Sequence, residues 1–99
     1  MRLTDAQRQT ILQIVTEELG PSASVRLFGS RLDDNARGGD IDLHVELSEP
    51  VAHPAQLSAR LSARIMRAMH GRKVDVLISA PNLSEQAIHR LAREQGARL

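Results

Sequence analysis

Residues 40–47 read Asp-Ile-Asp-Leu-His-Val-Glu-Leu, so polar and aliphatic side chains alternate along the whole segment. Alternation with a period of two is typical of a β-strand that has one buried face and one polar face. The aliphatic positions are Ile41, Leu43, Val45 and Leu47. Because a slip of one residue would turn the carboxylates into the core, these positions fix the register of the strand. The segment therefore predicts that Asp40 and Asp42 lie side by side on one face of a sheet.

Length and composition indicate one small domain over residues 1–99. Hydrophobic residues make up 41% of the 99 positions and charged residues 25%, which is ordinary for a globular domain. The absence of cysteine excludes disulfide scaffolds, zinc ribbons and thiol nucleophiles. Residues 1–9 lack the apolar core of a signal peptide, and no apolar run approaches the ~20 residues of a membrane span. We therefore expect a cytoplasmic protein with no membrane partner.

Caps and apolar spacing predict an α+β fold in which helices pack against a small mixed sheet. A capping box at Thr4–Gln7 starts the first helix, and Gly20 ends it. Further helices are predicted over 55–69 and 84–95, the second capped by Ser84. Strands are predicted over 24–28, 40–47 and 73–78. The order α-β-β-α-β-α does not supply a crossover helix after every strand, which favours an α+β domain.

A third carboxylate follows the same pattern. Asp75 lies in the predicted strand 73–78 between Val74 and Val76, so it faces away from the core. If the two strands are neighbours, Asp75 joins Asp40 and Asp42 in one cluster. Such carboxylates repel one another unless a cation lies between them, and Mg²⁺ prefers oxygen ligands completed by substrate phosphates. We therefore expect a site for Mg²⁺, or Mn²⁺ in its place, that supports phosphoryl-type transfer.

The segment Gly29-Ser30-Arg31 directly follows the first predicted strand. A strand that breaks into Gly-Ser before a helical turn offers backbone N–H groups and a hydroxyl, which together suit a phosphate. Arg31 adds positive charge beside them. Gly-Ser by itself is typical of a plain turn, but its conjunction with Asp-x-Asp ten residues later and a lone Asp in a later strand is much more specific.

Leu27–Arg31 followed by Gly39–Leu43 resembles the signature of the nucleotidyltransferase superfamily that includes DNA polymerase beta. More narrowly, nearly the whole chain is similar to the minimal nucleotidyltransferases of prokaryotes, which act as antitoxins. The resemblance implies the polymerase beta-like nucleotidyltransferase fold. It also implies transfer of a nucleoside monophosphate, AMP from ATP being the expected case, to an acceptor hydroxyl.

The resemblance also implies roles for individual residues. Gly29, Ser30 and Arg31 would hold the triphosphate of ATP or another nucleoside triphosphate. The remaining roles would fall to the carboxylates: Asp40 and Asp42 as metal ligands, and Asp75 as a ligand of one metal that helps to deprotonate the incoming hydroxyl. The acceptor would come from a partner, a second copy of the chain or a macromolecule. Minimal nucleotidyltransferases are commonly paired with a small helical HEPN-type toxin, whose tyrosine or other hydroxyl would receive the AMP.

The sequence departs from the family pattern at two places. Leu32–Asn35 follows Arg31 where many relatives have a small residue, Arg and Gly, and Gly39 precedes the first aspartate where relatives have Ser. Asp33 and Asp34 would repel a phosphate if they pointed inward, so we expect them to face solvent.

Two other classes of function are a protein-binding module and a nucleic-acid binder. A binding module that neutralises a partner protein by forming a complex, with weak catalysis or none, would keep the same fold and acids. A nucleic-acid binder is disfavoured by the formal net charge of +1 and by Phe28 as the only aromatic residue.

Several polar residues outside the signature have ordinary structural explanations. We expect His44, on the same strand face as Asp40 and Asp42, to be a half-buried surface histidine, with a base contact or proton transfer as alternatives. We expect His53, His70 and His89 to be surface residues. Arg60, Arg64 and Arg67 share one helix face, for which we favour solvation over contact with an acidic protein or a nucleic-acid backbone.

Overall fold

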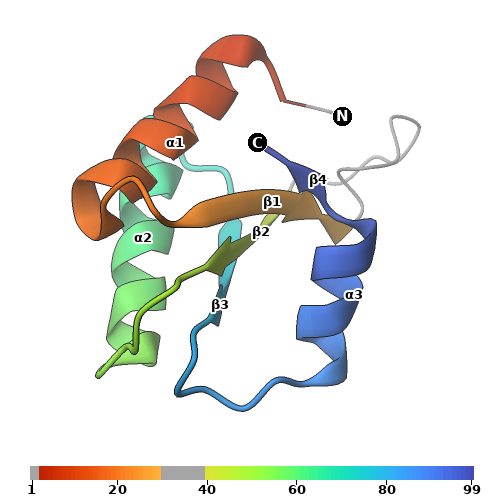
Figure 1. Cartoon of the computed structure of the whole chain (residues 1–99). Helices are drawn as coiled ribbons and strands as arrows, with labels where there is room; N and C mark the ends of the chain where they lie inside the picture. The colour runs from red at the N-terminus through yellow and green to blue at the C-terminus, as the bar shows by residue number, and fades with distance from the viewer. Residues whose placement is uncertain (1–2, 30–39) are drawn as a thin grey trace.

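The computed structural model describes residues 3–29 and 40–99. In this part of the chain the elements are α1 (Asp5–Leu19), β1 (Ser24–Phe28), β2 (Ile41–Glu46), α2 (Pro54–Ala68), β3 (Val74–Ser79), α3 (Ala87–Gln95) and β4 (Ala97–Arg98). The predicted α+β fold with a small mixed sheet is confirmed (Figure 1). None of these helices has the length and apolar character needed to cross a membrane.

The strands form one sheet in the order β3-β2-β1-β4. β1 runs antiparallel to both β2 and β4, whereas β2 and β3 are parallel. A parallel pair requires a long crossover, and α2 supplies it. This topology places the N-terminal ends of β2 and β3, where the predicted carboxylates lie, next to each other.

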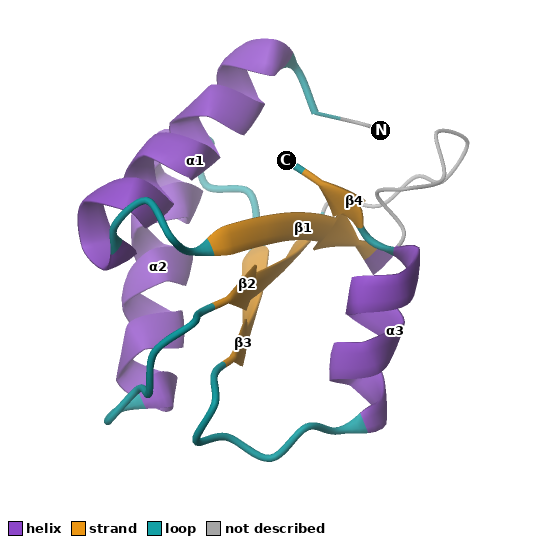
Figure 2. Ribbon diagram, viewed as in Figure 1, coloured by secondary structure: helices purple, strands orange, loops and turns teal. Residues whose placement is uncertain are grey.

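Helices cover both faces of the sheet (Figure 2). α1 and α2 lie on one side, where their apolar stripes meet the aliphatic face of the strands and form the core. The fully buried members of this core include Ile11, Leu27, Ile41, Leu43, Val45, Leu61 and Ile65. α3 lies on the opposite side, over the polar face of β1 and β2. α3 therefore covers part of the sheet face that carries the carboxylates.

The start of α1 follows the sequence prediction closely. The Thr4 hydroxyl accepts a hydrogen bond from the Gln7 backbone N–H at 3.1 Å, and the Gln7 side chain accepts one from the Thr4 N–H at 2.9 Å. This capping box satisfies two backbone donors at the helix start.

The predicted basic helix face is not a simple solvated one. In α2, Arg64 pairs with Glu17 at 2.7 Å and with Glu18 at 3.0 Å, and Arg60 pairs with Glu18 at 3.2 Å. These ion pairs join α2 to α1, so the acids of α1 neutralise much of the positive charge of this helix face.

The C-terminal region departs from the sequence prediction. α3 begins at Ala87 instead of residue 84, because its cap is Gln86 and not Ser84. The Gln86 backbone N–H donates to His89 Nδ1 at 3.0 Å, and His89 Nε2 lies 3.1 Å from the carbonyl oxygen of Ile78. The helix start is thus fixed by a tertiary contact with β3. The short strand β4, which pairs with Arg26 and Leu27, was not predicted.

Candidate active site

The three predicted carboxylates lie on one face of the sheet. In the parallel pair of β2 and β3, Asp42 is directly opposite Asp75. Asp40 precedes Asp42 by two residues and therefore has the same orientation. The two strands are thus neighbours, and their pairing brings the three carboxylates to a common surface.

A lysine that the sequence analysis did not single out completes this surface. Lys73 precedes β3, and its Nζ lies 3.8 Å from Asp40 Oδ2 and 4.0 Å from Asp75 Oδ2. The side chains of Lys73, Asp40 and Asp75 are all at least half exposed. The signal that could have found Lys73 is its spacing, because residues 73 and 75 of one strand must share a face.

Gly29 closes the other side of the site at the end of β1. Its φ is +78°, a left-handed conformation that L side chains rarely adopt. A Cβ atom at this position would lie 2.5 Å from Asp42 Oδ2, well inside van der Waals contact. The backbone therefore approaches the Asp42 carboxylate as closely as it does only because residue 29 has no side chain.

Asp42 has a raised pKa. Burial raises the pKa of Asp42 above its ordinary value, and the neighbouring charges of Asp75 and Asp40 raise it further, while Lys73 lowers it. A carboxylate whose charge is unfavourable in the metal-free protein is stabilised when a cation binds beside it.

Comparison with known proteins identifies the family of this domain. Residues 8–95 match a family described as a nucleotidyltransferase domain. The chain belongs to this family.

Solved structures of toxin–antitoxin complexes share the fold of this nucleotidyltransferase domain. One, described as MntA–HepT, contains a chain with 15% identity and a TM-score of 0.65, covering 96% of this chain and 70% of that one. A tyrosine-to-alanine mutant described as MntA–HpeT gives 18% identity and a TM-score of 0.71, covering 99% and 72%. At such identities the likeness establishes the fold alone. No curated protein matches the sequence.

A pocket of about 370 Å³ adjoins the two opposed carboxylates of the nucleotidyltransferase domain. Asp42 and Asp75 form its polar wall, and Phe28, Leu77 and Ile88 contribute apolar surface. Ile88 belongs to α3 and is 47% exposed. The pocket thus combines an anionic edge with an apolar wall, which suits a ligand that carries a phosphate–metal group next to a flat or apolar group.

The carboxylates suit a hard divalent cation in their chemistry. Within residues 3–29 and 40–99, no three His, Cys, Asp or Glu side chains converge closely enough to hold one ion, and the Lys73 ammonium lies between two of the carboxylates instead. The donors are nevertheless carboxylate oxygens on adjacent strands, the set that Mg²⁺ prefers. Asp40 and Asp75 are half exposed or more, so they can change rotamer without unpacking the core. The three carboxylates thus suit such a cation in their chemistry, although their present rotamers do not converge on one ion.

Part of the predicted phosphate site lies outside the described residues. This holds for Ser30, Arg31, Asp33 and Asp34, and for the helical turn expected after Ser30. Gly29 is described, and it lies against Asp42 at the edge of the carboxylate surface.

Two histidines are more deeply buried than the sequence suggested. His44 is completely buried and His89 is 8% exposed, so the expectation of surface residues is wrong for both. His44 lies under α3 and His89 belongs to α3, and the two rings pack edge to face with centroids 6.4 Å apart. His44 Nε2 lies 2.7 Å from Ser79 Oγ, while His44 Nδ1 has no hydrogen-bond partner among the described residues. Burial lowers the pKa of His44, so this ring is neutral at neutral pH.

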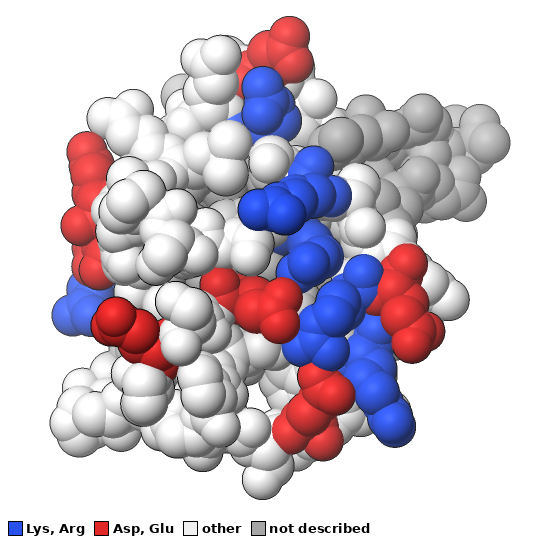
Figure 3. Space-filling model, in the orientation of Figure 1, with Lys and Arg blue, Asp and Glu red and all other residues white. Residues whose placement is uncertain are grey.

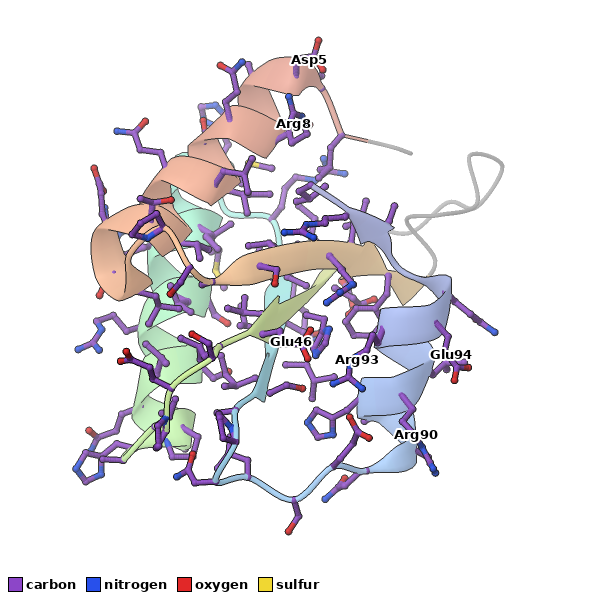
Figure 4. The ribbon with its side chains drawn as sticks, in the orientation of Figure 1. Asp5, Arg8, Glu46, Arg90, Arg93 and Glu94 are labelled. Carbon is purple, nitrogen blue, oxygen red and sulfur yellow. The ribbon has the colours of Figure 1, made fainter. Side chains whose placement is uncertain are left out.

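A charged network holds α3 on the sheet above these histidines. Glu46 of β2 accepts hydrogen bonds from Arg26 of β1 at 2.9 Å and from Arg93 of α3 at 2.9 Å. In Figure 4 Arg93 and Glu46 point toward each other across the space between α3 and the sheet. Figure 3 shows the resulting band of interleaved basic and acidic side chains over β1 and α3. This network belongs to the scaffold that supports the pocket wall at Ile88.

Proposed function

We propose that the protein transfers a nucleoside monophosphate from a nucleoside triphosphate, ATP being the expected one, to an acceptor hydroxyl with the help of Mg²⁺. The observation that carries the proposal is the opposed pair Asp42 and Asp75 on neighbouring parallel strands, with Asp40 on the same face. Membership of the nucleotidyltransferase domain family supports the same reaction class. A cytoplasmic location follows from the need for nucleoside triphosphates.

The transfer step places a distinct demand on each carboxylate. The acceptor oxygen attacks the α-phosphorus, a new O–P bond forms, and the bond to pyrophosphate breaks. We assign to Asp75 the role of general base, which accepts the proton of the acceptor hydroxyl. Its side chain is 57% exposed and can pass that proton on to water. Asp40 and Asp42 would hold the cation, with Asp75 as a further ligand, and Mg²⁺ when bound would supply positive charge to the phosphate oxygens.

The nucleotide would lie along the edge formed by Gly29 and the carboxylates. The close approach of the Gly29 backbone to Asp42 leaves room for phosphate oxygens where a side chain would otherwise project. Ser30 and Arg31 would add a hydroxyl and a positive charge to the same phosphates. The apolar wall at Phe28 and Ile88 would then receive the base or the acceptor side chain.

A protein acceptor is the favoured one. The domain provides one nucleotide-sized pocket beside the carboxylates and no separate lobe for an acceptor within the described residues. Its fold is shared with chains of complexes described as toxin–antitoxin pairs. We therefore propose that this protein is the antitoxin of such a pair and modifies a hydroxyl, such as that of a tyrosine, on a small helical HEPN-type toxin.

The test is transfer of label from α-labelled ATP, with Mg²⁺, to the protein that co-purifies with this one. Asp42→Asn should abolish transfer, and Glu94→Gln, an exposed change on α3, should leave it intact. A non-catalytic binding module is the second candidate, favoured by the spread of the three carboxylates around Lys73. If wild type and Asp42→Asn neutralise the partner equally and neither transfers label, the binding module is the correct function.

A further inference from the structure

The pairing of β2 and β3 fixes the position of Lys73 relative to the three carboxylates. The backbone N–H of Ile41 donates to the carbonyl oxygen of Lys73 at 2.9 Å, and this hydrogen bond joins the N-terminal ends of β2 and β3. Lys73 therefore stands beside Asp40, one step before the opposed pair of Asp42 and Asp75. Because side chains two residues apart share a face, all four project from the same surface.

The position of the Lys73 ammonium between two carboxylates is that of a counter-ion. Its distances of 3.8 Å to Asp40 and 4.0 Å to Asp75 are too long for strong hydrogen bonds but suit an ion pair. Because its side chain is 65% exposed, Lys73 gains little packing from residues 3–29 and 40–99 that would hold it there. Attraction to the carboxylates, which otherwise repel one another, is thus what places it.

We propose that Lys73 is a positioning residue that serves as the internal counter-ion of the site and must be displaced when the divalent cation enters. This inference rests on the proposed metal site. Before the cation arrives, the ammonium holds Asp40 and Asp75 toward each other. A cation that takes direct carboxylate oxygens removes both partners of the ammonium, which then swings into solvent or onto the triphosphate. A free cation therefore binds less tightly than a cation that arrives with a nucleotide.

Binding of Mn²⁺, measured by the electron paramagnetic resonance signal of the free ion, tests this without any activity. Lys73→Gln should bind Mn²⁺ about five-fold more tightly than wild type in the absence of nucleotide. With a non-hydrolysable ATP analogue the difference should shrink. Lys73→Arg keeps the charge and should behave as wild type. Arg72→Gln removes the same charge one residue away. A gain in Mn²⁺ affinity of less than two-fold in this variant excludes a general electrostatic effect.

The metal-free protein supplies the second measurement. In a double-mutant cycle of Lys73→Gln with Asp40→Asn, urea unfolding at low salt should show a coupling that disappears in 0.5 M NaCl. Equal Mn²⁺ binding by Lys73→Gln and wild type, or no coupling in the cycle, overturns the counter-ion role while leaving the proposed function intact. Binding of Mn²⁺ with nucleotide by Asp42→Asn as tightly as by wild type overturns the metal site itself.

Discussion

Gly29 and Asp42 lie so close that a methyl group on the glycine would meet the carboxylate: its Cβ would be 2.5 Å from Asp42 Oδ2. Gly29 directly follows β1, and Asp42 lies on the adjacent antiparallel strand β2, where Phe28 is its register partner. The turn after β1 is therefore built against the carboxylate that stands at the centre of the site. The contact joins the predicted phosphate-binding segment, which begins at Gly29, to the predicted cation site. In the sequence these are two separate motifs.

Gly29→Ala should separate site geometry from stability. Alanine at φ +78° costs about 1–2 kcal/mol of folding free energy through backbone strain. It also pushes the Asp42 carboxylate aside, so binding of Mn²⁺ with ATP should fall more than ten-fold.

Gly71→Ala is the matched control for that experiment. Gly71 has φ +83°, but no atom of the described part of the chain lies within 4 Å of the added methyl group. Urea unfolding should show similar destabilisation for the two variants, and a thermal-shift titration should show lost binding for Gly29→Ala only. Equal nucleotide binding by both variants would contradict the close-approach role of Gly29.

Asp42 should make the metal-free protein less stable as the pH rises. Its pKa is raised in the folded state, chiefly by burial, so the folded protein binds a proton more readily than the unfolded chain. Stability is therefore lost as the pH rises from the ordinary value of 3.8 through the folded pKa. Asp42→Asn should melt at or above the wild-type temperature at pH 7 without metal, and the difference should vanish below pH 4. A lower melting temperature at pH 7 would identify Asp42 as a structural acceptor.

His44 should have the opposite dependence on pH. Burial lowers its pKa below the ordinary value of 6.5, so the unfolded chain binds a proton first. Stability is complete above pH 6.5 and is lost as the pH falls through the folded pKa. His44→Gln, which cannot be protonated, should lose this slope between pH 6.5 and pH 5, whereas His53→Gln at an exposed position should keep it. Chemical unfolding at several pH values measures both slopes.

Glu46 should hold α3 in place through its two arginine partners. Its pKa is lowered because the hydrogen bonds from Arg26 and Arg93 outweigh the opposing effect of burial. Glu46→Gln should cost about 1 kcal/mol and reduce hydrogen-exchange protection of α3 amides selectively. Glu17→Gln, which removes an exposed partner of Arg64, should cost less and leave α3 protected. Uniform loss of protection over all helices would argue against a local role for Glu46.

The sequence was most informative where one residue pattern had one physical solution. Alternation over 40–47 placed Asp40 and Asp42 on one face, because Ile41 and Leu43 could only be buried. The register that sets Asp42 opposite Asp75 depends on how β2 and β3 pair, and neither strand contains that information alone. The place of Lys73 beside Asp40 follows from the same register.

The sequence was least informative where a tertiary contact decided the structure. Ser84 is a good cap in isolation, yet α3 begins later because His89 bonds both to Gln86 and to the carbonyl of Ile78. The same helix position covers the polar strand face and buries His44, which a strand pattern alone shows as half-exposed. β4 spans only Ala97–Arg98 and exists through pairing with β1, so it has no pattern of its own.

Asp75→Asn should distinguish an enzyme from a binding module. The amide can still lie beside a cation, but it cannot accept the proton of the acceptor hydroxyl. Binding of Mn²⁺ with a non-hydrolysable ATP analogue should therefore be largely kept, while transfer of label should slow by on the order of 10²-fold or more. Asp42→Asn, at the buried centre of the site, should lose binding and transfer together, and Glu94→Gln should lose neither. A wild-type rate of transfer in Asp75→Asn would remove Asp75 from the chemistry and leave it as a cation ligand only.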